Sequence, residues 1–118
     1  MRALSLRASM EQIAALAEAG RVALEQRNWR ELAALMRRNF QLRRQLYGDA
    51  VVGPQNLAMV AAAESVGAAG KLTGSGGAVV ALCPEGAAQQ EQLRAACTAA
   101  SFECVSVEVG PVLHQVSP

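Results

Sequence analysis

The stretch from Gly67 to Val80 holds residue types at a spacing that suits the binding of an anion. Three glycines, Gly74, Gly76 and Gly77, fall within four positions, and Lys71 is the only lysine of the chain. Glycine permits positive φ angles and close approach of the main chain to a ligand. Backbone N–H groups in such a loop can converge on an anion. The candidate binding residues of this stretch are Lys71, Thr73, Gly74, Ser75, Gly76 and Gly77.

Two well-known phosphate-binding loops do not fit this spacing. A Walker A loop requires Ser or Thr directly after Gly-Lys, whereas Leu72 follows Lys71 here. A dinucleotide-binding loop requires a third glycine and then a helix, whereas Val79 occupies the third position and begins a strand-forming run. The remaining interpretation is a strand, a glycine turn and a second strand. A tight hairpin that uses glycine only for its geometry is the alternative to an anion-binding turn.

Helices and a few short strands must position this turn. Apolar residues at helical spacing predict helices over 9–26 with Ser9 as N-cap, 29–47 with Asn28 as N-cap, 54–66 and 87–100. Strand-forming runs cover 79–83 and, with alternation, 102–109. This order indicates an α+β fold, with helices covering one face of a small antiparallel sheet. A further strand is expected before residue 1, which suggests that the chain is part of something longer.

The composition excludes several classes of function. The chain has 118 residues, is 52% hydrophobic and 18% charged, and carries a net charge of +1. It is therefore long enough for one globular domain and offers no electrostatic basis for binding nucleic acid or a membrane surface. No apolar run reaches the length of a membrane-spanning helix. Three cysteines without a Cys-x-x-Cys pair and a single histidine, His114, favour free thiols in a reducing, cytoplasmic compartment and argue against a metal site.

The expected second helix carries a stripe of arginines. Arg30, Arg37 and Arg44 recur every seven residues and therefore share one side of the helix, with Arg38 and Arg43 beside them. An arginine donates two parallel hydrogen bonds to a carboxylate, so one or two of these side chains are candidates to hold an anionic substrate. A solvated helix face is the alternative interpretation.

The segment Gly67-x-x-Gly-Lys-Leu-Thr-Gly-Ser-Gly-Gly-Ala78 resembles the third signature motif of the GHMP small-molecule kinases. This family includes galactokinase and the homoserine, mevalonate and phosphomevalonate kinases. The flanking segments are similar to those of plant and algal glucuronokinases: Leu35-Met-Arg-Arg-Asn-Phe-Gln-Leu-Arg-Arg44, Tyr47-Gly-Asp49 and Leu82-Cys-Pro-Glu-Gly86. The resemblance extends from about residue 10 to residue 109.

This resemblance implies that residues 1–118 form a ferredoxin-like C-terminal domain, whose partner would be an N-terminal GHMP kinase domain. It implies transfer of the γ-phosphate of ATP, with Mg²⁺, to the 1-hydroxyl of D-glucuronate, with the glycine turn beside the phosphate cleft. Arg43 or Arg44 would hold the carboxylate of this sugar acid. The family's Pro-x-x-x-Gly-Leu-Gly-Ser-Ser motif and an upstream catalytic aspartate are absent from this sequence. We therefore assign no catalytic residue and expect the chain alone to be inactive and to hold no ATP or Mg²⁺ by itself.

Two other functions remain open on these grounds. A non-catalytic domain would bind a small ligand or a protein partner through an exposed sheet edge. Another GHMP kinase, of mevalonate or galactose type, would share the glycine motif and act on a different substrate.

Overall fold

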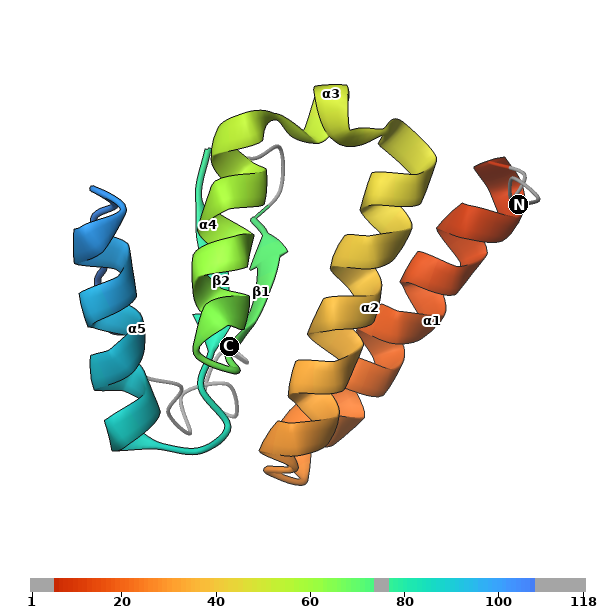
Figure 1. Cartoon of the computed structure of the whole chain (residues 1–118). Helices are drawn as coiled ribbons and strands as arrows, with labels where there is room; N and C mark the ends of the chain where they lie inside the picture. Colours follow the sequence, from red (N-terminus) through yellow and green to blue (C-terminus); the bar gives the residue numbers. More distant parts are fainter. Residues whose placement is uncertain (1–5, 74–76, 108–118) are drawn as a thin grey trace, which may run out of the picture.

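Helices and one short hairpin follow each other along the chain in the computed structural model, which describes residues 6–73 and 77–107 (Figure 1). Helices α1 and α2 lie side by side, α3 joins α2 to α4, and α5 packs on α4. This arrangement confirms the predicted α+β class. The elements are α1 (Leu6–Glu25), α2 (Trp29–Tyr47), α3 (Asp49–Val52), α4 (Pro54–Ser65), β1 (Ala69–Leu72), β2 (Val79–Leu82) and α5 (Ala87–Ala99).

Local capping signals set the ends of α2 and the start of α4. The Asn28 side chain accepts a hydrogen bond from the backbone N–H of Glu31 at 3.2 Å, which satisfies one of the free donors of the first turn of α2. Gly48 ends the helix with a φ of +83°, and its N–H donates to the carbonyl of Arg44 at 2.8 Å. Pro54 opens α4 at a position where its missing N–H costs nothing. These three predictions are confirmed.

The predicted N-cap at Ser9 is wrong, because α1 begins at Leu6 and Ser9 lies inside the helix. Leucine, arginine and alanine at positions 6–8 are strong helix formers, and their propensity extends the helix beyond the expected cap. The sequence also gave no indication of α3, a single turn of four residues between Gly48 and Gly53. Both flanking glycines have positive φ angles, so they allow two sharp changes of direction between α2 and α4.

β1 and β2 form an antiparallel hairpin in which Ala69 pairs with Leu82 and Leu72 pairs with Val79. Side chains along a strand alternate between the two faces of a sheet. Leu72 packs with Val60 of α4 and Phe40 of α2, whereas Ala69, on the opposite face, packs with Ala33 and Met36 of α2. Helices therefore contact β1 on both faces, and not only on one face as the sequence suggested.

β1 and the residue before it lie at the centre of the apolar core. Three clusters of buried side chains are present in the described chain, and each includes one residue from this short segment. Ala68 and Ala69 are 0% exposed and Leu72 is 7% exposed. Small side chains here let three helices approach the strand closely, and this packing fixes the start of the glycine turn. The clusters are Phe40, Val52, Val60 and Leu72; Ala33, Met36 and Ala69; and Ala63, Ala68 and Leu93.

The prediction of a strand over 102–109 is wrong for residues 102–107; residues 108 and 109 lie outside the described chain. Val105 and Val107 are 76% and 79% exposed, so the alternating valines have no apolar layer to cover them. Arg94 of α5 instead holds this segment by donating to the carbonyl of Cys104 at 3.4 Å and to Ser106 Oγ at 2.7 Å. Alternation indicates a strand only where a neighbouring strand is available, and sequence alone does not show one.

Within 6–73 and 77–107, no helix combines the length and apolar character needed to cross a bilayer.

Candidate anion-binding site

The first glycine of the motif ends a helix. Gly67 has a φ of +80°, and its N–H donates to the carbonyl of Glu64 at 3.0 Å, while the N–H of Ala68 donates to the carbonyl of Ala63 at 3.0 Å. These bonds satisfy free carbonyls at the end of α4, and a left-handed residue at this position is typically glycine. Gly67 therefore turns the chain from α4 into β1.

The second glycine of the motif permits close packing of α4 on the hairpin. A Cβ atom on Gly70 would lie 3.3 Å from Val79 Cγ1, 3.4 Å from Val60 Cγ2 and 3.5 Å from Val60 Cα. One of these neighbours is backbone, which cannot move aside easily. The close approach for which glycine is suited occurs here between a helix and a strand, and not between main chain and ligand.

The turn between the strands is described only at its two ends. Thr73 donates its N–H to the carbonyl of Ala78 at 3.3 Å, and its hydroxyl donates to the same carbonyl at 3.1 Å. Gly77 is exposed, has a φ of +88°, and a Cβ atom there would have no neighbour within 4 Å. Thr73 thus closes the hairpin. The predicted binding positions Gly74, Ser75 and Gly76 lie outside the described residues, so their role stays a prediction.

Lys71 lies on β1 at the beginning of this turn. Its side chain shares a sheet face with that of its register partner, Val80, which is 44% exposed. Lys71 is half-buried, and its Nζ donates to the carbonyl of Leu72 at 3.1 Å. Burial lowers the pKa of Lys71, and the positive charge of Arg43 lowers this pKa further. No acidic side chain among the described residues forms an ion pair with Lys71.

Arg43, on α2, is the side chain whose positive charge lowers the pKa of Lys71. It is half-buried, its Nε is enclosed without a hydrogen-bond partner, and it forms no ion pair within the described chain. Asn39 lies one helical turn earlier and therefore on the same side of α2. It is 8% exposed, and its Oδ1 also lacks a partner. A buried polar side chain without a hydrogen bond is uncommon and calls for an explanation.

Arg44 differs from Arg43 although the two are adjacent in sequence. Its Nε donates to Asp49 Oδ1 and its Nη2 donates to Asp49 Oδ2, both at 2.8 Å. Its guanidinium also lies over the Phe40 ring, 5.9 Å from the ring centroid. The bond and charge of Arg44 hold the pKa of Asp49 below its usual value. The carboxylate that Arg44 binds in the fold belongs to Asp49, whereas the resemblance predicted the carboxylate of a substrate.

The other two members of the arginine stripe are paired as well. Arg37 forms an ion pair with Glu64 at 3.2 Å and donates from Nη2 to the carbonyl of Gly67 at 2.8 Å. Arg30 forms an ion pair with Glu85 at 2.9 Å. The stripe therefore connects α2 to α4 and to the segment after β2, and it is not simply solvated. Exposed pairs of this kind each contribute little to stability.

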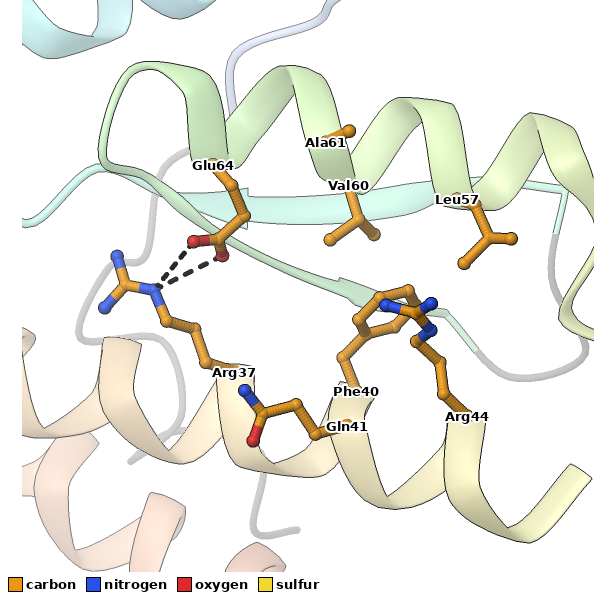
Figure 2. A pocket seen from close by; sticks show the side chains of 8 residues that line it. All are labelled: Arg37, Phe40, Gln41, Arg44, Leu57, Val60, Ala61 and Glu64. Atoms are coloured by element: carbon orange, nitrogen blue, oxygen red, sulfur yellow. Dashed lines mark hydrogen bonds and ion pairs between the residues drawn. The ribbon is translucent and has the colours of Figure 1, made fainter. Parts of the chain in front are cut away.

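A groove of about 440 Å³ runs between α2 and α4 (Figure 2). Arg37 and Glu64 face each other across one end, and Arg44 lies beside Phe40 at the other. Lys71 and the turn do not line this groove, so it is separate from the Arg43–Lys71 region. The lining residues are Arg37, Phe40, Gln41, Arg44, Leu57, Val60, Ala61 and Glu64.

Sequence reasoning identified Lys71 and Arg43 separately but missed Asn39. An asparagine at an apolar spacing within α2, three residues after Met36 and four before Arg43, was the available signal. The structure places Asn39 and Arg43 on one side of α2, and the charge of Arg43 acts on Lys71 of β1.

A helix-rich α+β domain with a glycine turn after its first strand is the class that this fold and site define. Residues 21–101 match the family described as GHMP kinases C terminal, which is more than half of the chain. The chain belongs to this family.

Two curated proteins of Arabidopsis thaliana are similar to the chain. Probable glucuronokinase 2 is 48% identical over 103 residues, and Glucuronokinase 1 is 46% identical over 103 residues. Each alignment covers 87% of this chain but 28% of the relative, so the chain spans less than a third of the length of these relatives. No solved structure matches the chain.

Proposed function

We propose that the chain is the C-terminal domain of a glucuronokinase, an enzyme that transfers the γ-phosphate of ATP to the 1-hydroxyl of D-glucuronate. The observation that carries this proposal is the similarity of 87% of the chain to two proteins named as glucuronokinases. The family match over 21–101 includes every candidate residue, from Arg43 to Gly77. An N-terminal kinase domain would be the partner that completes the active site.

The glycine turn would lie beside the phosphates of the bound nucleotide. Mg²⁺ would neutralise charge that develops on the transferred phosphoryl group. The backbone N–H groups from Gly74 to Gly77 would donate to that charge, and loss of one such donor typically raises a barrier by about 3 kcal/mol. The bonds from Thr73 to Ala78 would keep the ends of the turn together. Fixed donors of this kind need no reorganisation when the reaction occurs.

A chimera tests this proposal. In Arabidopsis thaliana Glucuronokinase 1, the matched 103-residue segment is replaced by the corresponding part of this chain. We expect the chimera to phosphorylate D-glucuronate with ATP and to be inactive with mevalonate and galactose. Gly76→Val in the chimera should abolish activity and leave circular dichroism unchanged. The chain by itself should produce no ADP above background with D-glucuronate.

Two results would contradict the proposal. One is a folded chimera that phosphorylates mevalonate or galactose in preference to D-glucuronate, which would indicate another GHMP kinase. The other is a folded chimera inactive with all three substrates, which would favour a non-catalytic domain. Wild-type rates for Gly76→Val would show that the turn serves only the hairpin.

A further inference from the structure

Three polar side chains of α2 and β1 lack, among the described residues, the partners that such groups usually have. Within that part of the chain, the enclosed Nε of Arg43 has no acceptor, the enclosed Oδ1 of Asn39 has no donor, and Nζ of Lys71 donates to the carbonyl of Leu72. Two of the three are cations on neighbouring elements: Arg43 follows Met36 by two helical turns on α2, Met36 packs with Ala69, and Lys71 shares the strand face of Ala69. No described carboxylate pairs with either cation.

Two half-buried positive charges close together repel each other and are poorly solvated, so they destabilise the fold unless an anion compensates them. On the groove side of α2, carboxylates of the chain itself compensate the positive charges: Arg37 pairs with Glu64 and Arg44 pairs with Asp49. On the Arg43 side, no acidic side chain within 6–73 and 77–107 forms an ion pair with Arg43 or Lys71. The missing negative charge must therefore come from outside the described residues.

We propose that Arg43 and Lys71 bind the carboxylate of a hydroxy acid. The fork of Arg43 matches the two oxygens of a carboxylate, and Lys71 adds a point charge. This inference deepens the proposed function, on which it rests for naming the sugar acid as D-glucuronate. It assigns the substrate carboxylate to Arg43 and not to Arg44. It also places Lys71 beside this carboxylate and not beside the phosphates of ATP.

Some of the residues beside Lys71 are exposed to solvent. Val80, which shares the sheet face of Lys71, is 44% exposed, and Thr73 and Gly77 are exposed at the adjacent turn. The other face of β1 packs closely on α4, where a Cβ atom on Gly70 would lie 3.3 Å from Val79 Cγ1 and 3.4 Å from Val60 Cγ2. Lys71 therefore lies on the sheet face opposite the one that packs on α4.

A titration of the 118-residue chain tests this inference without any catalytic turnover. The proton–nitrogen correlation signals of the arginine Nε–H groups are followed by nuclear magnetic resonance, and Arg43→Lys and Arg44→Lys variants assign them. Three probes are added at equal ionic strength: D-glucuronate, D-glucose and inorganic phosphate. We expect D-glucuronate to shift the Arg43 signal saturably and leave Arg44 unchanged, and D-glucose to shift neither.

Lys71→Met should weaken D-glucuronate binding about tenfold or more, because a hydrogen bond to a charged group contributes about 1.5–3 kcal/mol. No shift of Arg43 with D-glucuronate, or tighter binding of phosphate than of D-glucuronate at Arg43, would overturn the inference. Binding at Arg43 together with an inactive chimera would refute the proposed kinase function and leave the carboxylate site standing. An active chimera together with an unperturbed Arg43 signal would support the kinase function and refute the carboxylate site.

Discussion

The two ends of the glycine-rich motif around β1 differ in how closely they are packed. At the packed end, Ala69 is fully buried and Gly70 touches α4 so closely that a Cβ atom would contact backbone. At the open end, Lys71 is half-buried and Gly77 has no neighbour within 4 Å of a Cβ position. Yet both ends belong to one glycine-rich motif. Its first glycines therefore serve helix termination and packing, whereas its last glycine serves a turn whose surface is open.

The same contrast divides the charges of α2. On the groove side, Arg37 and Arg44 each hold a carboxylate of this chain. Towards the open end of β1, Arg43 faces a second cation and no acid among the described residues. Arg37 and Arg44 already have an acceptor in this chain, whereas Arg43 has none among the described residues and is available to bind a ligand.

Gly70→Val should produce the largest loss of stability. The added side chain would overlap Val79 and the main chain at Val60, and overpacking of this kind costs about 1–3 kcal/mol or more. Urea denaturation would measure the change in the free energy of unfolding. Gly20→Ala is the control, because a Cβ atom there lies at an ordinary 3.7 Å from Leu32, and alanine should stabilise α1 by about 0.5–1 kcal/mol. An unchanged urea midpoint for Gly70→Val would contradict the close packing of Gly70 against α4.

Gly77→Ala should have a smaller effect, from backbone strain alone. The residue has a φ of +88°, and no atom would touch the added methyl group. Alanine in this region of conformational space costs about 1 kcal/mol relative to glycine. The same urea titration checks this. A loss as large as that of Gly70→Val would mean that the open end is packed after all.

Lys71→Met should leave the stability unchanged or raise it by a few tenths of a kcal/mol, because a poorly solvated cation near Arg43 is removed. The pKa of Lys71 in the folded state lies below its ordinary value, so the unfolded state binds more protons as pH rises through that range. Native stability therefore increases with pH there, and the advantage of the methionine variant shrinks. Denaturation at neutral and alkaline pH measures the difference; a clear loss of stability at neutral pH would show that Lys71 has a stabilising partner.

Much of the fold could be predicted because its boundaries depend on local chemistry. Asn28, Gly48 and Pro54 act within one helical turn of their own positions, and all three set the ends that the sequence indicated. Residues 102–107 could not be predicted in the same way. Their alternating valines fit a strand, but a strand needs a partner, and Arg94 holds this segment along α5 instead.

The sequence predicted most residues of the candidate site, but it did not predict which of them lie close together. Arg43 and Arg44 are chemically identical neighbours, and only the fold places Asp49 against one and Lys71 near the other. Asn39 was missed because a polar residue inside a helix is usually solvated, and its burial arises from tertiary packing. The positions Gly74, Ser75 and Gly76 stay predictions from the motif.

The Michaelis constant for D-glucuronate in the chimera tests the central contrast between Arg43 and Arg44 most directly. Arg43→Leu should raise KM for D-glucuronate about tenfold or more and leave KM for ATP unchanged, because a charged hydrogen bond to the substrate is lost. Arg44→Leu, the matched control, should change neither constant by more than about twofold, since its partner is Asp49 and an exposed pair contributes little. A rise in KM for D-glucuronate with Arg44→Leu alone, or an equal rise for both substrates with Arg43→Leu, would contradict the account.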